Sequence, residues 1–126
     1  MQENSWQIYK FGGSSLSDSD CILNVCNLIK ENSSQNLIVV VSAMAGVTNQ
    51  LVDYSKSRNQ SILEEIEDRY RATINETIQE ESIHEALLEE FSNDVKIINE
   101  LAESYSEKSI KTEENQILGF GEIWSS

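Results

Sequence analysis

The stretch KFGGSS, residues 10–15, stands at the end of the chain's first apolar run. Residues 6–10 are predicted to form a strand and residues 17–30 a helix, so Gly12 and Gly13 fall in the turn between them. Paired glycines let the backbone approach a ligand closely and adopt dihedral angles that other residues avoid. Backbone amides in such a turn, with a helix N-terminus behind them, attract phosphate. With the positive charge of Lys10 beside it, the turn predicts a phosphate site; the alternative is a plain tight connection.

Two common nucleotide-binding patterns are absent from the chain. Neither G-x-x-x-x-G-K-[ST] nor G-x-G-x-x-G occurs, which argues against a P-loop enzyme and against a dinucleotide-binding fold. In this chain the lysine precedes the glycines instead of following them. The phosphate site therefore requires a different architecture.

Composition indicates a globular protein of 126 residues with a formal net charge of −13. Residues 63–114 hold 16 of the 22 acidic residues, an acidity that disfavours nucleic acid and anionic membranes as partners. No segment approaches the roughly 20 apolar residues of a membrane span, and the N-terminus lacks the layout of a secretion signal. Cys21 and Cys26 share one predicted helix, where both are expected to be buried and reduced. A cytoplasmic location follows most simply.

The first forty residues predict a strand–helix–strand unit of an α/β fold. The helix at 17–30 carries an apolar stripe through Ile22, Cys26 and Ile29. Residues 37–41, LIVVV, are a β-branched run typical of a parallel strand covered on both faces. Since two parallel strands are too few for an independent sheet, the chain is expected to be a fragment of a larger α/β domain.

Residues 42–46 are predicted to turn the chain into a second helix, and two long amphipathic helices and a last helix from about Thr112 follow. The long helices are expected to pair as an antiparallel hairpin. Capping boxes are predicted to open three of the helices, at Ser17-x-x-Asp20, Ser61-x-x-Glu64 and Ser82-x-x-Glu85. The apolar stripes of these helices run through Val47, Leu51 and Tyr54; through Ile62, Ile66, Tyr70, Ile74 and Ile78; through Leu87, Phe91, Val95, Ile98, Ala102 and Tyr105; and through Ile117, Leu118 and Trp124.

Three separated motifs together resemble the aspartate kinases. Residues 10–16, KFGGSSL, are similar to their K-F-G-G-T-S-V signature, and residues 40–49, VVSAMAGVTN, to V-V-x-S-A-x-x-G-[VI]-T-N. Residues 121–125, GEIWS, resemble the G-E-x-x-S at the start of a later helix. Either of the first two motifs alone would leave glutamate, acetylglutamate or uridylate kinase open. The departures are mild, and Ser14 in place of the usual threonine keeps a hydroxyl.

The resemblance implies an amino-acid-kinase-like three-layer sandwich with a parallel sheet. This chain would be its N-terminal part: a βαβα start (1–58), a helical hairpin insert (59–108) and the start of a substrate-contacting helix (109–126). The implied reaction transfers the γ-phosphoryl group of ATP to the β-carboxylate of L-aspartate, the first step of lysine, threonine and methionine biosynthesis. A homo-oligomer is implied for the full-length enzyme, and the isolated fragment is expected to be inactive.

The resemblance also implies roles for individual residues. On the ATP side, Lys10 would be catalytic and would bind phosphate together with Gly12, Gly13 and Ser14. Mg²⁺ would bridge the nucleotide phosphates, with no protein ligand assigned.

On the aspartate side, the resemblance gives substrate binding to Ser42, Thr48 and Glu122. Ser42 follows the second predicted strand and Thr48 opens its helix, at the edge where open parallel sheets bind ligands. A helix N-terminus with hydroxyls suits a carboxylate. Glu122 would face the substrate ammonium; without the resemblance it would pass for a surface glutamate. Two further possibilities stay open: another member of the amino-acid kinase superfamily, or a non-catalytic module that uses its acidic helices as a partner surface.

Overall fold

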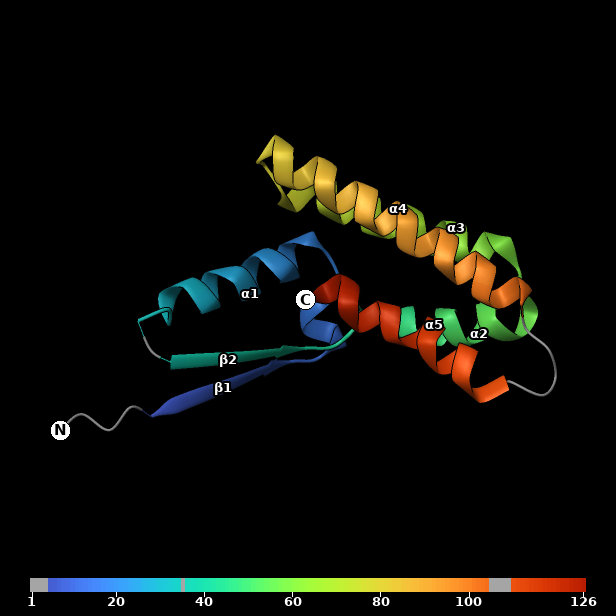
Figure 1. Cartoon of the computed structure of the whole chain (residues 1–126). Coiled ribbons are helices and arrows are strands. Elements are labelled where there is room, and N and C mark those ends of the chain that lie inside the picture. Colours follow the sequence, from blue (N-terminus) through green and yellow to red (C-terminus); the bar gives the residue numbers. More distant parts are fainter. Residues whose placement is uncertain (1–4, 35, 105–109) are drawn as a thin grey trace.

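The computed structural model describes residues 5–34, 36–104 and 110–126, together with the side chains outside 110–112. Along the chain these residues form two strands, a short 3₁₀ helix and five α-helices (Figure 1). Their bounds are β1 (Trp6–Phe11), η1 (Gly13–Leu16), α1 (Ser19–Glu31), β2 (Asn36–Val41), α2 (Val47–Ser57), α3 (Gln60–Thr77), α4 (Glu81–Glu103) and α5 (Ile110–Ser125).

The predicted strand–helix–strand unit is confirmed. Strands β1 and β2 pair in parallel, from Trp6 opposite Asn36 to Phe11 opposite Val41. Helix α1 connects them and lies along one side of the pair (Figure 1). Because the strands are parallel and end in register, the segments that follow Phe11 and Val41 leave the sheet at the same edge.

The prediction that the sheet is covered on both faces is wrong for the described chain. Side chains alternate between half-buried and exposed along both strands. On the exposed face, Trp6 is 64% and Ile8 68% accessible, and Ile38 and Val40 are 44% and 45% accessible. Only α1 lies against this two-stranded sheet among the described elements, so the β-branched run supplies one covered face and one open apolar face.

The main core lies among the last four helices. Helix α2 packs against α3 and α5, and α4 packs against the same two helices, which closes a ring of four. Helices α3 and α4 form the predicted antiparallel hairpin (Figure 1). Side chains from all four helices and from the loop before α2 share one buried cluster: Ala43, Met44, Val47, Leu51, Tyr54, Leu63, Ile66, Tyr70, Phe91, Val95, Ile98, Ala102 and Ile117. The expected stripes supply most of this cluster, and Tyr105 falls outside the described residues.

The predicted capping boxes are wrong. Helix α1 is capped by Asp18, whose carboxylate accepts a hydrogen bond from the Cys21 backbone amide at 2.9 Å. This contact also lowers the pKa of Asp18. At α3 the cap is Asn59, which accepts from the Ser61 amide at 3.1 Å. Aspartate and asparagine cap at least as well as serine, and each takes the cap position in place of the predicted serine.

Helix α4 begins after Glu80 with no side-chain cap, so Ser82 does not cap it either. The cysteine prediction is also partly wrong. Cys21 is half-buried, and Cys26 is exposed because α1 turns only Val25 fully inward. Within the described ranges, no helix is long and apolar enough to span a membrane.

Candidate functional site

The glycine turn leaves the sheet directly after β1. Lys10 is exposed and alternates with Ile8, which places it on the open face of the sheet. Gly12 has an ordinary extended backbone, with φ −78° and ψ 173°, and Gly46 is the only described glycine with a positive φ. The expectation that the paired glycines need unusual dihedral angles is therefore wrong.

A full helix N-terminus does not stand directly behind these glycines. The short η1 helix follows Gly12, and α1 begins at Ser19 with its first turn already capped by the carboxylate of Asp18. The backbone amides that remain for a phosphate are those at the start of the short turn, since the first N–H groups of a helical turn have no partner within it.

Gly13 is required by a close contact with the loop after β2. A Cβ atom at Gly13 would lie 3.1 Å from the carbonyl oxygen of Ala43 and 3.3 Å from Cα of Ala45. A Cβ atom at Gly12 would meet nothing within 4 Å. The two glycines therefore differ: Gly13 lets two backbones touch, and Gly12 leaves open space beside the turn.

The loop after β2 carries the second motif. The Ser42 amide donates to the carbonyl of Phe11 at 3.0 Å, which extends the strand pairing by one residue. Gly46 then adopts φ +84° as the N-cap residue of α2, with no side-chain cap hydrogen bond. No side chain caps this helix N-terminus by a hydrogen bond, and the Val47 amide is bonded to the Met44 carbonyl at 3.0 Å. The positive end of the helix dipole and the exposed Thr48 in the first turn favour an anionic group at this point.

The third motif packs against the same loop. A Cβ atom at Gly121 would lie 2.9 Å from the Cβ of Ala43 and 3.5 Å from Cγ1 of Val47. This close approach brings α5 onto the loop and places Glu122, which is exposed, next to the point of contact. The structure thus brings all three motifs together around Ala43, through Gly13 on one side and Gly121 on the other.

One contact of this region was not found from the sequence. Arg69 of α3 donates hydrogen bonds to the carbonyls of Ala45 and Ser17, each at 2.6 Å. Ser17 ends the glycine turn and Ala45 belongs to the loop after β2. No local pattern marks this arginine, because its partners lie 24 and 52 residues away along the chain.

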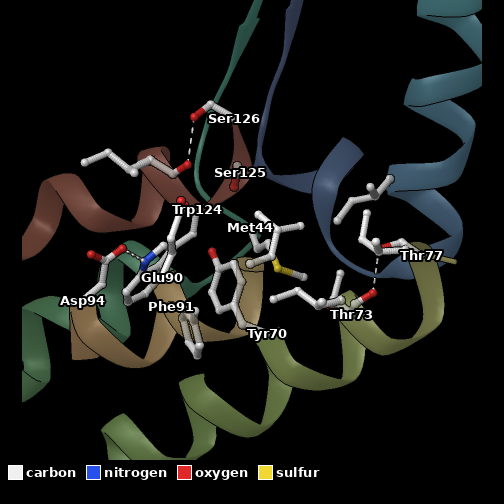
Figure 2. A pocket seen from close by; sticks show the side chains of 15 residues that line it. Met44, Tyr70, Thr73, Thr77, Glu90, Phe91, Asp94, Trp124, Ser125 and Ser126 are labelled. Atoms are coloured by element: carbon white, nitrogen blue, oxygen red, sulfur yellow. Dashed lines mark hydrogen bonds between the residues drawn. The ribbon is translucent and has the colours of Figure 1, made fainter. Parts of the chain in front are cut away.

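An apolar pocket of about 230 Å³ lies beside the loop (Figure 2). Met44 and Trp124 line it, and the Trp124 indole packs on the Tyr70 ring at 5.0 Å and donates to Asp94 at 3.0 Å. The hydroxyl of Tyr70 is buried there without a hydrogen-bond partner. Burial raises the pKa of Tyr70, and the Ser125 side chain offsets part of this rise. None of the seven predicted site residues lines this pocket, so the predicted site is a surface formed by the loops.

Known proteins resemble this chain, several of them along nearly all of its length. The sequence model described as "Amino acid kinase family" matches residues 5–125. "Bifunctional aspartokinase/homoserine dehydrogenase 2" of Escherichia coli is 30% identical over 95% of the chain and 15% of its own length. "Aspartokinase" of Chlamydia pneumoniae is 39% identical over 53% of the chain and 16% of its own length.

Solved structures show the same fold. Escherichia coli aspartokinase III in complex with lysine and aspartate matches with a TM-score of 0.78 at 23% identity, over 98% of this chain and 27% of that one. Its complex with aspartate and ADP gives 0.77 at 24% identity, over 94% of this chain and 26% of that one. This likeness confirms the predicted α/β fold class. The chain spans about 15% of the length of the bifunctional relative from Escherichia coli.

Proposed function

The chain belongs to the amino acid kinase family, and on this basis we propose that it supplies substrate-binding groups of an aspartate kinase. The reaction is transfer of the γ-phosphoryl group of ATP to the β-carboxylate of L-aspartate, which gives 4-phospho-L-aspartate. One observation carries the proposal: three motifs far apart in the sequence touch at Ala43, through Gly13 and Gly121. The relatives named aspartokinase support the choice within the family.

The glycine turn is the phosphate side of the proposed site. Phosphoryl transfer asks the protein mainly for positioning and for stabilisation of charge. The ammonium group of Lys10 stabilises negative charge on the transferring group, and the amides of Gly12 and Gly13 donate to phosphate oxygens. Ser14, exposed in the same turn, adds a hydroxyl donor. The open space beside Gly12 gives the nucleotide access to these amides.

The loop after β2 and the end of α5 are the aspartate side. Ser42 and Thr48 offer hydroxyls beside the uncapped N-terminus of α2, a combination that favours a carboxylate. Glu122 binds the α-ammonium group of the substrate through opposite charge. Because Gly13 contacts the loop directly, the two substrates meet across a short distance, as in-line transfer requires.

Mg²⁺ would enter the proposed site with the nucleotide. Within the described residues, no group of three or more histidine, cysteine or acidic side chains is placed to hold a metal ion.

The test is a coupled ATP-turnover assay on the full-length protein that carries this segment, with a panel of acceptors. We expect turnover with L-aspartate at an ordinary enzymatic rate, roughly 1–10³ s⁻¹, and none with L-glutamate, N-acetyl-L-glutamate or UMP. Turnover with one of these acceptors instead would assign the protein to another branch of the family. Turnover with none of them would favour a non-catalytic module. The 126 residues alone are expected to stay far below the rate of the full-length protein.

A further inference from the structure

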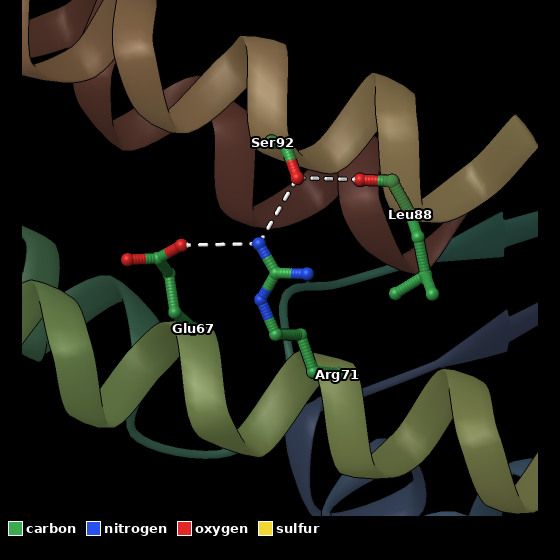
Figure 3. Close-up of polar contacts among 4 residues, drawn as sticks. All are labelled: Glu67, Arg71, Leu88 and Ser92. Atoms are coloured by element: carbon green, nitrogen blue, oxygen red, sulfur yellow. Dashed lines mark hydrogen bonds and ion pairs between the residues drawn. The ribbon is translucent and has the colours of Figure 1, made fainter. Parts of the chain in front are cut away.

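Two arginines two positions apart on α3 make very different contacts. Arg71 bonds within the helical hairpin, to the Glu67 carboxylate at 3.4 Å and the Ser92 hydroxyl at 3.0 Å (Figure 3). Arg69, in the same acidic helix, bonds instead to two backbone carbonyls, those of Ser17 and Ala45. The guanidinium of Arg69 thus donates its hydrogen bonds outside the hairpin, to the loops of the proposed site.

The two carbonyls belong to different sides of that site. Ser17 directly follows η1 and so ends the phosphate-binding turn, and Ala45 directly precedes Gly46, the N-cap residue of α2. The same two loops already touch at Gly13, which approaches Ala43 and Ala45. They are therefore held together twice: by backbone contact at the start of the turn and by Arg69 at its end.

Arginine suits this task better than lysine does. Its planar fork directs donors from two nitrogens in fixed directions, whereas a lysine ammonium is a single point charge on a flexible stem. In this structure Nη1 donates to Ala45 and Nη2 to Ser17, both at 2.6 Å. Since α3 is anchored in the helical core by Ile66 and Tyr70, which are 0% and 3% exposed, the fork is held from a rigid base.

We propose that Arg69 is a positioning residue, which sets the separation between the phosphate-binding turn and the aspartate-binding loop. The expected effect on catalysis rests on the proposed function, whereas the two hydrogen bonds by which Arg69 ties the loops do not depend on it. A small misplacement of reacting groups can cost about a hundredfold in rate. Loss of the tie is therefore expected to slow phosphoryl transfer while each loop still binds its own substrate.

The first test is amide hydrogen exchange, measured on the full-length protein that carries this segment by mass spectrometry with fragmentation that resolves single amides. The reporters are the Ser15 amide, bonded to Gly12, and the Val47 amide, bonded to Met44. Arg69→Gln should speed exchange at both by about tenfold or more, the size expected for hydrogen bonds from a charged donor, and leave Val95 of the core unchanged. Arg71→Gln is the matched control and should leave Ser15 and Val47 at their wild-type rates. Unchanged rates in Arg69→Gln, or an equal acceleration at Val95, would overturn the proposal.

The second test is steady-state kinetics on the full-length protein. Arg69→Gln should lower kcat by roughly tenfold to a hundredfold and leave the KM values for ATP and aspartate within about threefold, with Arg69→Lys in between. A merely structural role would reduce the amount of folded enzyme and leave kcat per folded molecule unchanged, which would overturn the proposal. If the wild-type protein does not phosphorylate aspartate, the proposed function fails, and the exchange experiment still decides whether Arg69 ties the loops. If the wild type is active and Arg69→Gln retains its kcat, the function stands and this inference fails.

Discussion

The strand–helix–strand part and the helical part of this chain are stabilised to very different degrees. Of the buried apolar side chains in the described residues, all but Leu16 and Val25 belong to one cluster that begins at Ala43 and ends at Ile117. The strands contribute no fully buried side chain, and one face of their sheet is open. The phosphate side of the proposed site is therefore carried by the part with little core, and its position depends on contacts with the helical part.

The two parts should differ most in how far the truncation of one apolar side chain lowers the free energy of unfolding. Ile98→Ala removes a side chain that is 0% exposed and should lower the free energy of unfolding by about 2–5 kcal/mol. Ile8→Ala truncates a side chain that is 68% exposed and should change it by less than about 0.5 kcal/mol. Urea unfolding of both variants measures the contrast. A comparable loss in both would mean that the open sheet face is covered in solution.

The contact between α5 and the loop is tested by a pair of glycines in one helix. A Cβ atom at Gly121 would lie 2.9 Å from the Ala43 Cβ, so Gly121→Ala should destabilise by about 1–3 kcal/mol through overpacking. Gly119 has open space around it, and Gly119→Ala should stabilise α5 by roughly 0.5–1 kcal/mol. Thermal unfolding compares the two variants. Equal midpoints would show that α5 does not pack on the loop as described.

Two buried tyrosines of the helical part should differ by a smaller amount in the stability that each loses on substitution by phenylalanine. The Tyr54 hydroxyl donates to the Asn99 side chain at 2.7 Å, so Tyr54→Phe should cost about 1 kcal/mol. The Tyr70 hydroxyl has no partner, so Tyr70→Phe should be neutral or slightly stabilising. Chemical unfolding of both variants at neutral pH measures the difference. A clear loss of stability in Tyr70→Phe would indicate that the Tyr70 hydroxyl forms a hydrogen bond in solution, with Ser125 as a candidate partner.

The same tyrosines predict a decline of stability in alkali. Burial raises the pKa of both above the ordinary tyrosine value. The folded state therefore holds these protons more tightly than the unfolded state does. Their contribution is complete below the unfolded pKa of about 10 and is lost as the pH rises through the folded values. Tyr70→Phe should reduce the slope of unfolding free energy against pH above about pH 10, and an unchanged slope would contradict a raised pKa.

The sequence predicted local elements well because their signals are local. A short apolar run placed the first strand, a continuous β-branched run placed the second, and helical spacing placed the stripe through Phe91, Val95 and Ile98. Helix caps were missed because neighbouring Asp18 and Asn59 competed with the serines for the same backbone amides. The open face of the sheet could not be predicted either. A β-branched run indicates that a strand can be buried on both faces, but it does not show whether other elements cover those faces.

The candidate site, too, could be predicted from the sequence only in part. The motifs identified Gly13 and Gly121, but only the structure shows that both touch Ala43, because the two contacts span long stretches of chain. Arg69 gave no signal, since its partners are backbone carbonyls whose position depends on the tertiary fold. The roles of Lys10, Ser42, Thr48 and Glu122 stay predictions.

Steady-state kinetics of Lys10→Ala and Glu122→Gln in the full-length protein, with each substrate varied in turn, test the central claim most directly. Lys10→Ala should lower kcat by roughly 10²–10³, the usual loss for a group aimed at developing charge, with little change in the KM for aspartate. Glu122→Gln keeps the shape of the side chain and should raise the KM for aspartate about tenfold or more, with that for ATP unchanged. A kcat within about threefold of wild type in Lys10→Ala, or a shift of the ATP KM in Glu122→Gln, would contradict a site with phosphate on the glycine turn and aspartate at α5.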